Sequence, residues 1–141
     1  MKVRDLMSRD VEFIAPDASV QDAATLMGEI DVGALPVGTA QHPRGVVTGR
    51  DLLYRVCAAG RDPAQTRVSE IMTHAVLGCV DSDDIEAALD RMAASHVRRL
   101  LVRDADGKTV GWVTLSDIAR YLLVDSELVR RGLLELNRSP A

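Results

Sequence analysis

The sequence predicts an α+β fold made of two copies of one motif, and three observations predict it. Short phrases recur in the same order at one offset, apolar residues recur at helical spacing, and short β-branched runs stand between the helical segments. VRDLM at 3–7 returns as VSEIM at 68–72, 65 residues later. GVVTGRD at 45–51 returns as GWVTLSD at 111–117, at an offset of 66 residues. This repetition indicates an internal duplication, so we expect two packed halves related by a pseudo-twofold axis.

Each copy opens with an extended segment that leads through turn residues into an amphipathic helix. The extended segments are VEFIAP in the first copy and VLGCV in the second. Turn and N-cap residues follow in Pro16–Ser19 and Asp81–Asp83, where we expect the helices to begin. The apolar positions at helical spacing are Val20, Ala23, Ala24 and Met27 in the first copy and Ile85, Ala88, Leu89 and Met92 in the second.

Two short strands and a second helix complete each copy. The strands are ALPV and GVVT in the first copy and RLLVR and GWVT in the second, where Asp106-Gly107 predicts a hairpin turn. RDLLYRVCAAG and LSDIARYLLV predict the closing helices. Each motif is therefore about β-α-β-β-α. We expect one motif at residues 1–65, the other at 66–125, and an amphipathic segment with a tail at 126–141.

Composition and charge narrow the class of protein. A chain of 141 residues with 47% hydrophobic and 27% charged residues is typical of one compact globular unit. The formal net charge of −4 argues against a nucleic-acid partner, which usually requires an excess of Lys and Arg. The sequence has no apolar run of roughly 18 residues and no apolar core behind its first basic residues, so we expect a cytoplasmic protein without a membrane span.

Catalytic and metal-binding motifs are missing from the sequence. His42, His74 and His96 have separations that match no hydrolase or zinc-protease motif. Cys57 and Cys79 are too few and too isolated for a zinc site or a disulfide framework, and we expect both to be buried. We therefore expect a protein that is not an enzyme and that requires no metal or cofactor.

The repeated phrase combines the signals of a strand end and a helix start. Its glycine lets backbone or a ligand approach closely. Thr48 with Asp51, and Thr114 with Asp117, have a capping-box spacing, in which each side chain accepts a bond from the other residue's backbone N–H. Capping alone explains both residues. Ligand binding is the alternative role for the aspartate, because a carboxylate also offers acceptors to ligand hydroxyl groups.

As an ordered set, these motifs resemble the cystathionine-β-synthase (CBS) domain family over residues 3–124. The matching motifs are DLM and EIM, DASVQDAATLM, VGALPV, GVVTGRD, VSEIMT, VRRLLV and GWVTLSD. The chain is most similar to small stand-alone bacterial proteins made of one CBS pair. The resemblance implies a Bateman module, in which two CBS motifs pack through their sheets. It also implies clefts for an adenosine-containing ligand, namely AMP, ADP, ATP, S-adenosylmethionine or NAD(H).

The resemblance further implies ligand contacts at matching positions. In the family the aspartate of the phrase accepts hydrogen bonds from ribose hydroxyls, and the threonine reaches ribose or phosphate. These residues are Thr48 and Asp51 in one cleft and Thr114 and Asp117 in the other. The expected adenine walls are Ile14, Pro16, Ala34, Leu35, Pro36, Cys79 and Val80.

Basic residues that could hold phosphate differ between the copies. His96, Arg98 and Arg99 precede a strand in the second copy, whereas Gly33 and Ala34 match the two arginines in the first. We therefore expect the second copy's cleft to be the better built for a phosphorylated ligand. The alternative is that the two arginines form a solvated strand end.

A smaller difference lies inside the phrase, where Arg50 stands beside Asp51 but Ser116 stands beside Asp117. We expect the Asp51 cleft to be weak, or to hold adenosine without a phosphate nearby.

We expect a non-enzymatic sensor that binds an adenosine-containing ligand. Because the repeats leave only short ends, its output would act in trans, on a separate effector protein. The alternative is a constitutive dimeric scaffold with vestigial clefts. At the C-terminal end, Leu128, Val129, Leu133 and Leu136 form an amphipathic segment, which Gly132 weakens as a helix. It would pack on the module or across a homodimer, or dock the effector.

Overall fold

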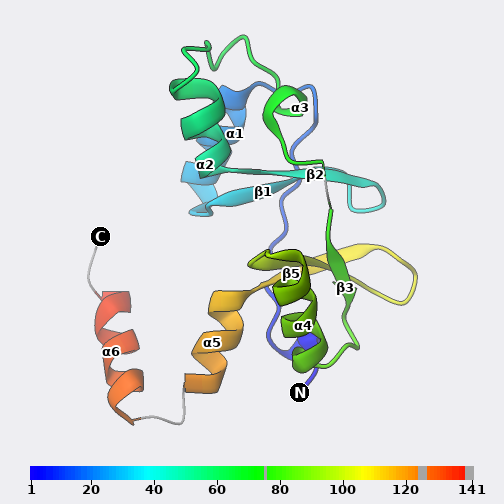
Figure 1. Cartoon of the computed structure of the whole chain (residues 1–141), viewed down its shortest axis with the longest axis vertical. Helices are drawn as coiled ribbons and strands as arrows, with labels where there is room; N and C mark the ends of the chain where they lie inside the picture. Colours follow the sequence, from blue (N-terminus) through cyan, green and yellow to red (C-terminus); the bar gives the residue numbers. More distant parts are fainter. Residues whose placement is uncertain (75, 124–126, 139–141) are drawn as a thin grey trace.

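Each half of the chain forms a small β-sheet with helices on its outer face, and the two sheets face each other (Figure 1). The computed structural model describes residues 1–74, 76–123 and 127–138. The first half contains α1 (Val20–Ile30), β1 (Ala34–Gly38), β2 (Pro43–Thr48), α2 (Gly49–Leu52) and a π-helical turn, η2 (Leu53–Cys57). The second contains β3 (Gly78–Val80), α4 (Ile85–Ser95), β4 (Arg99–Arg103), β5 (Thr109–Thr114) and α5 (Leu115–Leu123). The predicted α+β class with two repeats is confirmed.

The opening strand is complete in the second half only. There β3 pairs in parallel with β4, and β4 pairs antiparallel with β5. In the first half β1 and β2 pair antiparallel, and the opening segment makes only a single parallel bridge, from Ile14 to Val37. Proline explains the difference, because Leu101 N–H donates to the Leu77 carbonyl at 3.1 Å, whereas the matching residue, Pro36, has no N–H to donate.

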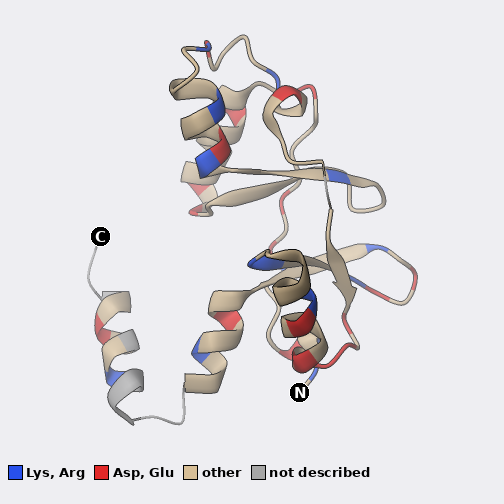
Figure 2. Ribbon diagram, in the orientation of Figure 1, with Lys and Arg blue, Asp and Glu red and all other residues tan. Residues whose placement is uncertain are grey.

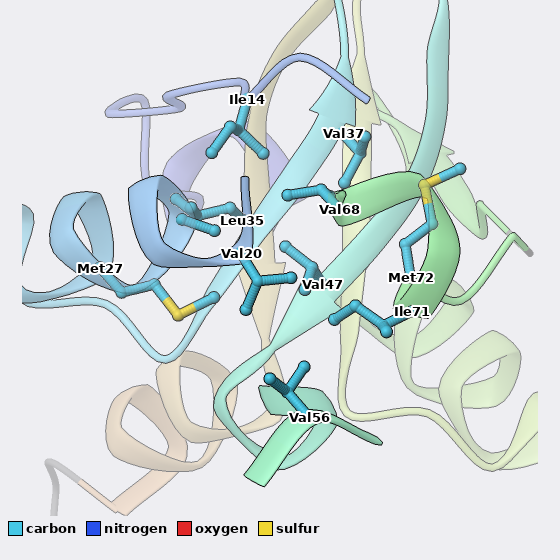
Figure 3. Close-up of a cluster of buried hydrophobic side chains, with 11 residues drawn as sticks. Ile14, Val20, Met27, Leu35, Val37, Val47, Val56, Val68, Ile71 and Met72 are labelled. Atoms are coloured by element: carbon cyan, nitrogen blue, oxygen red, sulfur yellow. The ribbon is translucent and has the colours of Figure 1, made fainter. Parts of the chain in front are cut away.

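The segments that precede the two motifs are exchanged between the halves. Residues around η1 (Val3–Asp5) pack in the second half, and those around α3 (Val68–Ile71) pack in the first, where Figure 3 shows Val68, Ile71 and Met72 in one cluster with Val20 and Val47. The core clusters therefore cross the repeat boundary, and the division at residue 65 stays a prediction.

The glycine of the repeated phrase allows these exchanged segments to cross the strands. Ser8 and Trp112 exchange backbone hydrogen bonds of 2.8 and 3.0 Å, and Thr73 and Val46 exchange two of 2.9 Å. A Cβ atom on Gly45 would lie 2.5 Å from the Thr73 carbonyl oxygen, and one on Gly111 would overlap the Ser8 carbonyl oxygen. The close approach expected at these glycines is therefore made by backbone.

Turns and caps largely follow the predicted positions. Ser19 Oγ accepts a 3.0 Å bond from Asp22 N–H at the start of α1, and Gly107 forms the hairpin turn with φ +83°. The N-cap of α4 is Asp84, one residue after the predicted turn, and its carboxylate pairs with Lys2 Nζ at 2.9 Å. Asp83 Oδ2 accepts from Val80 N–H within the turn instead.

The two cysteines differ in burial. Cys79 lies in the second core cluster, where burial raises the pKa of its thiol to about 11. Cys57 is exposed, so the prediction that both are buried was wrong for this residue. The period of η2 turns Val56 inward and leaves its neighbour Cys57 outside.

The C-terminal segment is helical despite Gly132, and α6 (Glu127–Arg138) is drawn apart from the two sheets in Figure 1. Leu134 and Leu136 are exposed, whereas the side chains of Leu128, Val129 and Leu133 lie outside the described residues. Within the described part of the chain, none of the helices has the length and apolar character needed to cross a membrane.

Candidate functional site

A cleft of about 610 Å³ lies between the two halves, within the size range of roughly 300–1,000 Å³ of small-molecule sites. Its apolar lining comes from both sheets, and a tryptophan lies at its wall. The residues that line it are Gly33, Val46, Thr48, Gly49, Arg50, Thr73, Leu77, His96, Val97, Arg98, Arg99, Leu101 and Trp112.

The repeated phrase forms a complete capping box in both halves. Thr48 N–H donates to Asp51 Oδ2 at 2.9 Å, and Asp51 N–H donates to Thr48 Oγ1 at 3.2 Å. Thr114 and Asp117 make the same pair of bonds, both at 3.1 Å. In each box the carboxylate accepts one bond, through Oδ2, so capping leaves Oδ1 with acceptor capacity toward a ligand.

An arginine one turn later faces each remaining carboxylate oxygen. Arg55 Nε lies 3.8 Å from Asp51 Oδ1, and Arg120 Nη1 lies 3.7 Å from Asp117 Oδ1. The halves differ because Arg55 Nη1 also donates a 2.9 Å bond to the carbonyl of Ile71, at the end of α3. Arg55 thus links Asp51, at the start of α2, to the segment that leads into the second half.

We expect Arg55→Met to lower the free energy of unfolding by about 1 kcal/mol, because it removes a charged donor from the Ile71 carbonyl at a half-exposed position. Arg120→Met is the matched control and should cost less than about 0.5 kcal/mol, since it removes only a long surface ion pair. Urea unfolding of the two variants measures both effects. Equal losses of unfolding free energy in the two variants would show that the hydrogen bond to Ile71 adds nothing to stability.

Three arginines from both halves line the same cleft. Arg50 comes from α2, while Arg98 and Arg99 follow α4, and Figure 2 shows basic positions at the start of α2 and at the end of α4. The Arg99 guanidinium lies 5.6 Å from the centroid of the Trp112 ring, and burial lowers its pKa. Among the described residues, none of the three forms an ion pair, and no carboxylate lines the cleft.

The structure groups the predicted phosphate-binding residues differently from the sequence analysis. Arg98 and Arg99 were expected with Asp117, but they line the cleft that holds Thr48 and Arg50. Asp51, although next to Arg50, does not line it, and neither do Thr114, Ser116 and Asp117. His96 also lies there, ending α4 in the left-handed region with φ 54°. Their binding roles stay predictions.

None of the expected adenine-wall residues lines this cleft. Ile14 belongs to the first core cluster, and the Pro16 carbonyl accepts a bond from Ser69 N–H at 2.9 Å. Ala34 and Pro36 are buried, and Ala34 packs with Leu101 and Trp112 between the sheets. The roles of Leu35, Cys79 and Val80 are likewise untested: the first two are buried in the core clusters, and Val80 is exposed.

Sequence reasoning missed Thr73 and Leu77, which line the cleft from the segment joining the halves. The offset between the repeats pointed to Thr73, because it matches Ser8 in the first copy. Each of these two residues pairs with a strand of the other copy. Within the described ranges, no group of three or more His, Cys, Asp or Glu residues is arranged to hold a metal ion.

The fold and the cleft define a class of protein, a paired-motif module whose α+β halves face each other across a site of small-molecule size. The family model of the CBS domain matches residues 3–57 and 68–124. The chain therefore belongs to the CBS domain family and contains two copies of the domain, and such modules are regulatory.

Relatives and solved structures agree with this assignment. The chain is 38% identical over 117 residues to CBS domain-containing protein YhcV of Bacillus subtilis, covering 83% of this chain and 82% of the relative. It is 33% identical over 120 residues to Hypoxic response protein 1 of Mycobacterium tuberculosis, covering 84% and 83%. A crystal structure of that protein with two coordinated zinc ions matches with a TM-score of 0.73 and 32% identity, covering 85% of this chain and 98% of that one.

A further solved structure is the CBS domain of a bacterial CNNM/CorC family Mg²⁺ transporter in complex with ATP. It matches with a TM-score of 0.75 and 27% identity, and the match covers 85% of both chains.

Proposed function

We propose that this chain is a cytoplasmic, non-enzymatic sensor that binds an adenosine-containing ligand between its CBS motifs and acts in trans. The observation that carries the proposal is the cleft between the halves, which combines Thr48 of the repeated phrase with three arginines that lack an ion-pair partner in the described structure. The ATP complex of a similar CBS domain supports it.

In this proposal the corner formed by Thr48 and Asp51 binds the ribose. Asp51 Oδ1, which the capping box does not use, accepts hydrogen bonds from the ribose hydroxyl groups. Arg55 either moves away from this oxygen or also contacts the ribose. Apolar side chains such as Leu77 and Trp112 offer surface to the base. The ligand then favours one arrangement of the halves by its differential affinity for it.

A thermal-shift panel of AMP, ADP, ATP, S-adenosylmethionine and NADH tests the proposal. A ligand at about 100 times its dissociation constant stabilises the folded state by about 2.7 kcal/mol. For a domain of this size we expect the melting temperature to rise by several degrees. If no adenosyl compound raises it at millimolar concentration, the sensor proposal fails.

A dimeric interaction scaffold is the second candidate, and exposed apolar side chains on the closing helices favour it. Leu53 and Tyr54 are 59% and 70% exposed in the first half, and Tyr121 and Leu122 are 40% and 59% exposed in the second. A similar CBS-CP12 protein is hexameric, with a TM-score of 0.77 and 29% identity. A homodimer through these helices is compatible with sensing, and it becomes the whole function only if the clefts stay empty.

A further inference from the structure

The helix α6 lies outside both copies of the CBS domain, because the second match to the family model ends at residue 124. Burial is described for residues 131, 132 and 134–137 of this helix, and all of these positions are exposed. Successive residues of an α-helix are rotated by about 100°, so these positions are spread around the whole helix. No side of this part of α6 is therefore buried against the rest of the chain.

An amphipathic helix of this length needs a surface to pack on. α6 has 12 residues, and helices of about this length are marginally stable in water on their own. At helical spacing, the sequence places Val129, Leu133 and Leu136 on one side of the helix, which we call the α6 stripe. The described side chain of the α6 stripe, Leu136, is 73% exposed. Its own chain leaves this residue uncovered.

A groove of about 600 Å³ runs between α4 and the start of α5, and it offers the surface that an amphipathic helix requires. None of the described residues of α6 lines this groove. Arg98 lies at its polar end, and Glu135, beside Leu136 on α6, carries the opposite charge. Among the described residues neither side chain forms an ion pair. The apolar residues that line the groove are Leu89, Met92, Ala93, Val97 and Leu115.

We propose that α6 of one copy packs its stripe into the α4–α5 groove of a second copy, while the second copy's α6 fills the first copy's groove. In its own chain α6 follows the last residue of α5, whereas the groove lies at the first residue, Leu115. The nine residues of α5, about 13 Å of helix, separate the two. A twofold exchange also covers Leu122 and Leu123, which are 59% and 46% exposed where the connection to α6 begins. This interaction goes beyond the proposed function and requires no ligand.

Sedimentation of the full chain and of two variants tests the exchange. Leu136→Asp places a charge in the α6 stripe, and we expect it to raise the dissociation constant of the dimer about tenfold or more. Leu134→Asp is the matched control, because Leu134 is also exposed but lies on the opposite side of the helix, so this dimer should change little. A wild-type chain that stays monomeric at submillimolar concentration would overturn the proposal. Equal effects of the two variants would also overturn it.

Cross-linking shows whose groove receives the helix. Ala93→Cys marks the groove and Leu136→Cys marks α6, each in a chain with Cys57→Ser, while the thiol of Cys79 stays buried. When the two chains are mixed with a short bismaleimide, we expect a cross-linked heterodimer. Ala94→Cys is the control, because Ala94 is the next residue of α4, is exposed and lies outside the groove, so it should link to Leu136→Cys about tenfold less.

Three results of the cross-linking would contradict the exchange. One is the absence of a heterodimer, and another is an equal yield from Ala93→Cys and Ala94→Cys. The third is a link that forms within a single chain carrying both Ala93→Cys and Leu136→Cys, without a link between chains, because α6 would then fill its own groove.

Discussion

Gly111→Ala is expected to lower the free energy of unfolding by about 2–4 kcal/mol, through overpacking and weakened hydrogen bonds. The added methyl group would overlap the Ser8 carbonyl oxygen and lie 3.1 Å from Met7 Sδ. Relieving that overlap requires the first segment to move off β5, which weakens the two backbone hydrogen bonds between Ser8 and Trp112. Urea unfolding, followed by circular dichroism, measures the loss.

Gly28→Ala is the matched control for this substitution. Gly28 lies in α1, and apart from its chain neighbours and the backbone of that helix no heavy atom stands within 4 Å of a Cβ placed on it. The same chemical change should therefore stabilise the protein by about 0.5–1 kcal/mol, because alanine favours a helix interior over glycine. If Gly111→Ala unfolds at the wild-type urea concentration, the exchanged segment does not cross β5 as described.

Asp51→Asn is expected to weaken ATP binding about 10- to 100-fold, because it removes the charge-assisted hydrogen bonds to the ribose that the proposed function assigns to this carboxylate. The amide oxygen can still accept from Thr48 N–H, so the capping box survives in part, and stability should fall by less than about 1 kcal/mol. Oδ1, which the proposed function assigns to the ribose, becomes an NH₂ group, which cannot accept a hydrogen bond from a hydroxyl.

Asp117→Asn provides the comparison between the two halves. It changes an identical capping box, but the cleft with three arginines lies beside Thr48, not beside Thr114. We therefore expect Asp117→Asn to weaken ATP binding less than Asp51→Asn does, and to lower the free energy of unfolding by a similar amount. A larger loss of ATP affinity from Asp117→Asn would show that the ATP site lies in the second half, where the sequence analysis expected phosphate to bind.

Local patterns predicted the elements of the fold well. Helical spacing located α1 and α4, and the spacing of Thr48 and Asp51 predicted a capping box that the hydrogen bonds confirm. These features depend on residues close in sequence, so the spacing of those residues is enough to predict them. The shortened opening strand of the first half could also have been read from Pro36, which cannot donate to a ladder.

Contacts between the halves could not be predicted in the same way. Comparing the copies assigned Arg98 and Arg99 to the second cleft, because it assumed that each motif builds its site from its own residues. The exchange of the segments around Val3 and Val68 and the packing of the sheets bring residues of both motifs to one cleft. That juxtaposition depends on how the sheets meet, and residue spacing within one copy does not report it.

A crystal structure of the chain grown with ATP tests the central claim most directly. We predict one ATP per chain between the halves, with its ribose at Thr48 and Asp51 and its phosphates among Arg50, Arg98 and Arg99. ATP bound only beside Thr114 and Asp117, or on the outer helices, would contradict the account. A cleft that stays empty at millimolar ATP would contradict it as well.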